Sequence, residues 1–223
     1  MKLIHTEYNL ELEIKENEIV VLFIENTMAY CQLMQDLWNQ VQGQEGHFIL
    51  SENENRLKIS KVMDCIFNPF SLNCNDRRVL NKLYQEIKEQ ADSFYQEESA
   101  KLNVTINNYL EHLLMQMPFA LKYDVIFDVI GLSKLYHVEI DCGGGSLLER
   151  IMDYLRVMAK ICSVTSYVFV GLKQYLSEED LNQLYKFVFY EKIHLLIIET
   201  SQMPLLTVEK GWILDKDLCI IDL

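Results

Sequence analysis

Residues 19–43, IVVLFIENTMAYCQLMQDLWNQVQG, decide the fold class of this chain. The run 19–24 is continuous, apolar and rich in β-branched residues, which is typical of a strand buried on both faces. Asn26 follows at a position where its side chain can cap a helix. The apolar residues after it recur at helical spacing and predict one buried face of a helix that ends near Gly43. Strand, cap and helix in this order begin an α/β layer.

Buried strands and amphipathic helices alternate again after residue 120. Strands are predicted at 138–140, 167–170 and 193–198, and a closing pair at 212–214 and 218–221. Helices are predicted at 125–135, from the capping box at Ser146 through Lys160, and from Ser177 to about Tyr190. Short strands also precede residue 19 and flank the polar tip at 52–55. This order predicts an α/β fold with a largely parallel sheet.

A segment of different character interrupts the α/β pattern. Apolar residues recur at helical spacing over 76–94 and again over 102–117, with a polar stretch at 96–99 and Pro118 after the second run. Two consecutive amphipathic helices predict an antiparallel hairpin. We therefore predict a split head domain, residues 1–70 and 121–223, that carries an inserted α-helical leg domain, residues 71–120.

Composition limits the classes of protein that the chain could belong to. Half of the residues are apolar, which supports a sizeable core. No run of about 18 apolar residues and no secretory signal are present, so we expect a cytoplasmic protein outside the membrane. The six cysteines include no C-x-x-C pair, and most of them are expected to be buried small hydrophobes. The formal charge of −13 predicts that an isolated monomer repels nucleic acid at long range.

Catalytic motifs are missing from the sequence. No glycine-rich phosphate loop with its lysine follows any predicted strand. The glycine cluster at 143–146 could bind an anion through backbone amides, but a flexible turn is the simpler interpretation. The five histidines show no metal-ligand spacing, and no nucleophile elbow is present. The sequence therefore favours a protein that is not an enzyme.

Four carboxylates form a candidate cation site. Asp124 and Asp128 are four residues apart and would share one face of a helix. Glu139 and Asp141 are two apart and would share one face of a strand. Oxygen ligands from two adjoining elements could hold calcium. The alternative is a solvated acidic rim, because acidic side chains are usually exposed.

Basic residues gather on two predicted helices. Arg150, Arg156 and Lys160 follow the polar side of one helix, where Asp153 interrupts them and could turn the ridge into a salt-bridged face. The second group is Arg77, Arg78 and Lys82 on the first helix of the insertion. Neither group has interleaved aromatic residues that would stack single-stranded bases.

Several stretches, taken together, resemble one family. They include IFNPFSLNCNDRRVLNKLY at 66–84 and YLSEEDLNQLYKFVFYEKIHLLIIE at 175–199. The others are residues 20–52, 120–141 and 211–223. In order and spacing they are similar to the type II-A CRISPR-associated proteins of spacer acquisition, which form rings and bind DNA ends.

The resemblance implies a nucleotide-hydrolase-like α/β head without the phosphate loop, bearing a helical leg. It also implies a homotetrameric ring that threads double-stranded DNA by its ends without sequence preference or catalysis. Calcium ions are implied at Asp124, Asp128, Glu139 and Asp141, although Lys122 stands where some members have an acid. The implied partners are the CRISPR integrase and the effector nuclease.

A ring would also overcome the unfavourable charge. It gathers four copies of each basic residue around one hole, where they would contact phosphates. The residues expected to bind DNA are Lys134, Arg150, Arg156, Lys160 and Lys173. A protein-interaction scaffold that never touches DNA and a degenerate nucleotide hydrolase remain the alternatives.

Overall fold

A computed structural model describes residues 1–124, 126–142 and 144–223 of the chain. Its contacts divide the chain into two compact units, Met1–Cys74 with Cys142–Leu223, and Asn75–Asp141. Residues 121–141, which the sequence analysis assigned to the head domain, therefore lie in the second unit. The boundaries of the head and leg domains stay a prediction. In the described part of the chain, no helix combines the length and the apolarity that a membrane crossing needs.

The first unit is built around a six-stranded sheet in the order β10-β9-β3-β8-β7-β6. All neighbouring strands are parallel except β10, which pairs antiparallel with β9. Every residue of β3 and β8 is buried, because both faces of the sheet are covered. The predicted α/β class and largely parallel sheet are confirmed. The strands are β3 Ile19–Ile24, β6 Met63–Ile66, β7 Ser166–Val170, β8 His194–Glu199, β9 Glu209–Leu214 and β10 Ile220–Asp222.

A smaller antiparallel sheet, in the order β2-β1-β4-β5, completes the strands of this unit. Its strand β2 alternates buried and exposed residues, as expected for a sheet with one face in water. Its buried side chains join those of β3 and α1 in one hydrophobic cluster. The strands are β1 Lys2–His5, β2 Leu10–Glu13, β4 Phe48–Glu52 and β5 Asn55–Leu57.

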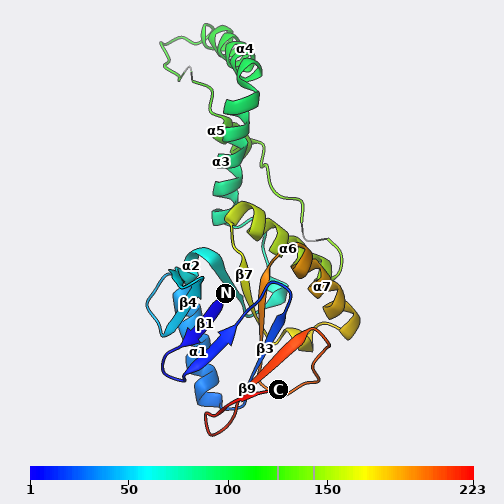
Figure 1. Cartoon of the computed structure of the whole chain (residues 1–223). Helices are drawn as coiled ribbons and strands as arrows, with labels where there is room; N and C mark the ends of the chain where they lie inside the picture. Colours follow the sequence, from blue (N-terminus) through cyan, green and yellow to red (C-terminus); the bar gives the residue numbers. More distant parts are fainter. Residues whose placement is uncertain (125, 143) are drawn as a thin grey trace. The chain divides into compact units, whose positions relative to one another are not determined.

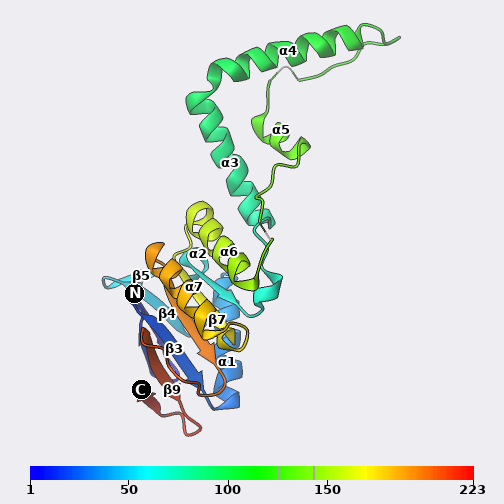
Figure 2. The same ribbon diagram turned by 90° about the vertical axis from the view of Figure 1, so that its right-hand side faces the viewer.

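Helices cover both faces of the large sheet. Figures 1 and 2 show α6 and α7 side by side on one face and α1 on the other. The crossover from β3 to β6 carries α1 and runs one way along the sheet, whereas α6 and α7 lie on the crossovers that return from β6 to β7 and from β7 to β8. Right-handed crossovers that run in opposite directions place their helices on opposite faces. The helices of the unit are α1 Thr27–Val41, α2 Ile59–Val62, α6 Leu147–Cys162 and α7 Glu178–Tyr190, with short 3₁₀ turns η1 Pro69–Ser71 and η2 Leu172–Gln174.

Three of the predicted helix starts are confirmed by their hydrogen bonds. The Asn26 side chain accepts hydrogen bonds from the backbone N–H groups of Met28 and Ala29. Ser146 and Ser177 each open a capping box, at α6 and α7 respectively. A polar side chain next to its own backbone forms these caps without help from the rest of the fold, so the sequence pattern is a reliable guide to them.

The second unit contains three helices, α3 Arg77–Phe94, α4 Gln96–Leu114 and α5 Val129–Leu135. The predicted antiparallel hairpin of α3 and α4 is wrong. Residues 96–99 are the first turn of α4 rather than a loop, so only Tyr95 separates the helices, which is too short for a reversal. Figure 2 shows the chain bending between them. No residue of α4 is buried, and α3 packs against α5 instead.

The end of this unit also differs from expectation. The predicted helix at 125–135 begins only at Val129, because the Asp128 side chain caps it by accepting from Ile130 N at 3.0 Å; residue 125 lies outside the described residues. The predicted strand at 138–140 is not formed. Instead the Asn75 side-chain amide donates to Ile140 O at 2.9 Å and accepts from Ile140 N at 2.8 Å, so a side chain takes the place of a neighbouring strand.

Candidate functional site

The carboxyl ends of parallel strands are where α/β folds usually bind nucleotides. Here only Glu25 and Asn26 connect β3 to α1. Asn26 Oδ1 lies 3.0 Å from both Met28 N and Ala29 N. Those N–H groups are the ones that a phosphate would need at a helix N-terminus. The chain's own side chain therefore already accepts from these two N–H groups.

At the carboxyl end of β8, too, a side chain of the protein itself accepts a backbone hydrogen bond. Glu199 is 1% exposed, and its Oε1 accepts from Lys173 N at 2.8 Å. Burial raises the pKa of this carboxyl above its ordinary value. At the N-terminus of α6, the Glu149 carboxylate accepts from Ser146 N at 2.7 Å. The described part of the 143–146 glycine turn therefore offers no free N–H at Ser146, while residue 143 lies outside the described residues.

Lys173 does not lie where a DNA contact requires it. Its Nζ donates to Glu209 Oε2 and to Pro204 O, both at 2.7 Å, and its side chain is 6% exposed. Tyr185 donates to the same Glu209 carboxylate at 2.5 Å. This placement corrects the prediction for Lys173, because a buried and paired ammonium is not available to a phosphate.

Helix α6 presents the remaining basic residues of the first unit. Arg156 Nη1 lies 2.9 Å from Asp153 Oδ1, and its guanidinium lies over the Phe187 ring of α7 at 5.2 Å. Lys160, one turn later on the same face, is exposed. Arg150 is partly buried, and its Nε has no hydrogen-bond partner among the described residues. The ridge is therefore salt-bridged at its centre and open at its C-terminal end.

The sequence analysis missed two exposed lysines, one on α7 and one just after it. Lys186 lies on the outer side of α7, and Lys192 directly follows the Glu191 that faces Arg156 at 3.9 Å. Single lysines beside buried apolar runs carry no motif, and only the packing of α7 on α6 brings Glu191, the residue before Lys192, to Arg156. Lys134 belongs to the second unit, where it is exposed in the last turn of α5.

The four predicted calcium carboxylates are all exposed and all lie in the second unit. Asp124 and Asp128 do not share a helix face, because Asp124 precedes α5 and Asp128 caps it. Glu139 and Asp141 flank the residue pinned by Asn75 rather than lying on a strand. Within the described ranges, no three of these carboxylates bring oxygens within 4.8 Å of one another. Their role in binding calcium stays a prediction.

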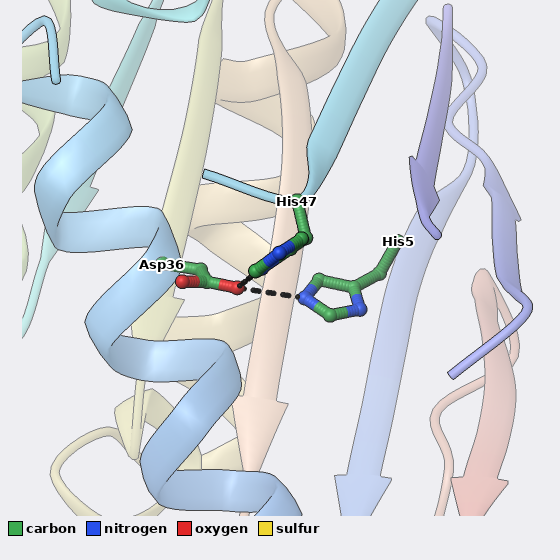
Figure 3. A group of neighbouring side chains, drawn as sticks. All are labelled: His5, Asp36 and His47. Atoms are coloured by element: carbon green, nitrogen blue, oxygen red, sulfur yellow. Dashed lines mark hydrogen bonds and ion pairs between the residues drawn. The ribbon is translucent and has the colours of Figure 1, made fainter. Parts of the chain in front are cut away.

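A cluster that the sequence analysis did not find lies at the smaller sheet. Asp36 of α1 accepts with its Oδ2 from His5 Nε2 of β1 at 3.0 Å and from His47 Nδ1 at 2.8 Å (Figure 3). His5 is fully buried, whereas 43% of the His47 side chain is exposed. Among the described residues, these three make the one group whose ligand atoms could together hold a metal ion. No local spacing in the sequence indicates it, because its members come from β1, α1 and the loop before β4.

The electrostatics of this cluster favour a charged Asp36. Burial alone would raise the pKa of its carboxyl, but hydrogen bonds from His5 and His47 outweigh burial and hold the pKa below its usual value. The hydrogen bond to Asp36, together with the charge of Glu7, raises the pKa of His47. Glu7 Oε1 lies 3.3 Å from His47 Nε2, so both nitrogens of this ring face a carboxylate.

Comparison with known proteins identifies the family to which the chain belongs. The model of the CRISPR-associated protein family Cas_Csn2 matches residues 40–218. The chain belongs to the Csn2 family. A crystal structure of Stu0660 of Streptococcus thermophilus resembles the whole of this Csn2-family chain and 76% of that one, with a TM-score of 0.58 at 14% identity, which indicates a shared fold. A putative ABC transporter ATP-binding protein from Pyrococcus furiosus aligns over 91% of this chain and 88% of its own, at 11% identity with a TM-score of 0.37.

Proposed function

We propose that this Csn2-family chain acts without catalysis in the capture of new CRISPR spacers. In this role it assembles as a homotetrameric ring in the cytoplasm and binds double-stranded DNA ends in a calcium-dependent, sequence-independent way. The match to the CRISPR-associated family over residues 40–218 carries the proposal. The α1 N-terminus supports a role without nucleotide hydrolysis, because Asn26 already caps two of the N–H groups that a phosphate would need.

The DNA contacts in this proposal come from the open end of the α6 ridge. Lys160 and Arg156 share a face of α6, with Lys192 nearby at the end of α7. Three cations are few against a net charge of −13 for each chain. A ring brings four copies of each to one channel, where the local potential rather than the net charge decides whether DNA enters. Contacts to phosphates alone would make the binding independent of sequence.

Calcium in this proposal is held by Asp124, Asp128, Glu139 and Asp141. Their exposure leaves the oxygens accessible to an ion, and calcium accepts carboxylates in flexible geometry. The Asn75 amide fixes the backbone of Ile140 and so limits the movement of its neighbours Glu139 and Asp141. The proposed protein partners are the CRISPR integrase and the effector nuclease, which would receive the captured DNA end.

A mobility-shift experiment tests the proposal. A linear duplex and a closed circle of the same sequence are each incubated with the protein in calcium and, separately, in a calcium chelator. We expect the linear duplex to shift in calcium only and the circle to remain unshifted, because a circle has no end to thread. Equal binding of circles and linear fragments would contradict threading, and binding that is unchanged by the chelator would contradict the role of calcium.

A matched pair of charge reversals locates the DNA surface. Lys160→Glu changes the exposed end of α6, whereas Lys216→Glu makes the same charge change in the turn between β9 and β10. We expect Lys160→Glu to abolish the shift of linear duplex and Lys216→Glu to leave it nearly unchanged. Equal losses in both variants would show that net charge, and not the α6 ridge, governs binding.

The second candidate function is a protein-interaction scaffold that does not contact DNA. The exposed side chains of α4 favour it. This helix has no buried residue, and it exposes Val104, Tyr109 and Leu113. Exposed apolar side chains of this size on one helix are typical of a protein-interaction surface. Light scattering with and without calcium separates the two candidates. A stable monomer in both conditions would rule out the ring and favour the scaffold.

A further inference from the structure

We propose that His5, Asp36 and His47 bind a transition-metal ion of the zinc type. The three side chains come from β1, α1 and the residue before β4, and they converge on one point (Figure 3). His5 Nε2 and His47 Nδ1 lie 3.0 and 2.8 Å from the same oxygen, Asp36 Oδ2. Zinc–nitrogen and zinc–oxygen bonds are about 2.0–2.2 Å, so an outward movement of a few tenths of an ångström would admit the ion between the donors.

The donor set decides the class of ion. Two imidazoles and one carboxylate suit zinc and its neighbours among the transition metals, whereas calcium and magnesium prefer a shell of oxygens. Three protein ligands also leave a fourth tetrahedral position for water. The cluster is therefore distinct in chemistry from the four carboxylates proposed for calcium, and the two can be tested separately.

The surroundings hold the two imidazoles in place for this role. The His5 ring stacks on Tyr8 at 5.1 Å and meets the edge of Phe48 at 4.6 Å. Its Nδ1 has no hydrogen-bond partner among the described residues, so the cluster is the polar contact of this buried ring. His47 is partly exposed and gives an ion a route from solvent to the buried Asp36.

Glu7 supplies the outer support that metal-binding histidines generally have. With Nδ1 of His47 on the metal, its Nε2–H would donate to Glu7 Oε1, which lies 3.3 Å away. Such a carboxylate fixes the tautomer and the orientation of the ring. Gln32 Nε2 lies 3.4 Å from the other Glu7 oxygen and helps to hold the carboxylate. Glu7 therefore acts as a positioning residue and not as a ligand.

Binding of the ion would tie the smaller sheet to α1. His5 and Asp36 are 31 residues apart, and Asp36 and His47 are 11 apart. A metal that binds the folded chain better than the unfolded one adds stability by mass action. The expected consequence is a first unit whose stability depends on zinc, independently of calcium and of DNA.

The test uses the full chain freed of metal by a chelator and then dialysed. Zinc is titrated by calorimetry, and cobalt is added as a spectroscopic probe whose visible absorption reports tetrahedral coordination. We expect one equivalent of zinc to bind, an intense cobalt spectrum and a rise in the unfolding temperature with zinc. None of these three results should require calcium or DNA. The absence of zinc binding at micromolar concentrations, or of the cobalt spectrum, would overturn the proposal.

Three variants make the test specific. His47→Gln removes the partly exposed ligand, and we expect zinc affinity to fall at least about tenfold while the metal-free chain stays folded. Glu7→Gln should weaken affinity by about 10- to 100-fold, as loss of an outer-shell carboxylate generally does. His112→Gln removes an exposed histidine of α4 and serves as the control that should bind zinc normally. If all variants bind zinc like the native chain, the site is elsewhere and the proposal fails, whatever the calcium experiments show.

Discussion

Lys173 shows how much one residue's function depends on its partners. Its ammonium pairs with Glu209 at 2.7 Å, and both side chains are almost fully buried. Each charge is tolerated inside the protein because the other compensates it, and Glu209 also accepts from Tyr185 and from Leu206 N. At this position the ammonium compensates a buried carboxylate and is not exposed to a ligand.

We predict that Lys173→Met destabilises the chain by about 3–5 kcal/mol, because it leaves the buried Glu209 carboxylate without its cation. Denaturant unfolding measures the change. The double variant Lys173→Met/Glu209→Gln, which removes both charges, should recover most of the loss. DNA binding by folded Lys173→Met should match that of the native chain. A selective loss of DNA binding at full stability would show instead that Lys173 contacts DNA.

His194 makes stability depend on pH. Burial on β8 lowers the pKa of its imidazole below the ordinary value of 6.5. The unfolded chain therefore takes up a proton at a higher pH than the folded chain does, so this contribution to stability is present above pH 6.5 and is lost as the pH falls through the folded pKa. We predict that native chain and His194→Gln diverge in pH dependence, the native chain losing more free energy of unfolding on acidification. Parallel curves between about pH 7.5 and 5 would show that His194 does not titrate in this way.

At the scale of elements, the segment after α5 depends on a side chain for its backbone hydrogen bonds. Asn75 both donates to and accepts from Ile140, as a neighbouring strand would. His137, at φ 50°, turns the chain away from helix just before this contact. One amide thereby sets the conformation of the segment that carries two of the proposed calcium ligands.

We predict that Asn75→Ala destabilises this segment by about 1–3 kcal/mol, because the N–H and C=O groups of Ile140 lose their partner. Hydrogen exchange at the Ile140 amide should become faster. Calcium affinity should fall in the same variant, since Glu139 and Asp141 lose their fixed backbone. Asn103→Ala on α4 is the control, and it should leave both measurements unchanged. Faster exchange with unaltered calcium affinity would separate the segment from the calcium site.

At the scale of the whole molecule, the proposed ring makes DNA binding depend steeply on salt. Each phosphate that a cation neutralises contributes about −0.9 to the slope of log K against log salt concentration. We predict that Lys160→Gln flattens this slope by up to about 3–4, because all four subunits lose one cation together. Lys216→Gln serves as the matched control and should leave the slope in place. A slope that is equal in the two variants would exclude Lys160 from the phosphate contacts.

Features that depend on neighbouring residues were predictable from the sequence. The burial of β3 follows from its continuous apolar run, and Asn26, Ser146 and Ser177 mark helix starts because each bonds to its own nearby backbone. The alternation of such strands with amphipathic helices was enough to indicate a largely parallel α/β sheet. The short strand β6 was missed, because its four residues carry no pattern that separates them from the loops around them.

Only the tertiary structure decided what depends on contacts between distant residues. It brought together His5, Asp36 and His47 from β1, α1 and the loop before β4, and it buried Lys173 against Glu209. It also replaced a predicted strand by hydrogen bonds to Asn75. The sequence by itself determined the class of the layers and the ends of most helices, because side-chain periodicity and capping act within a few residues. Partners across the fold depend on which strands pair and which faces are covered, and no local pattern records either.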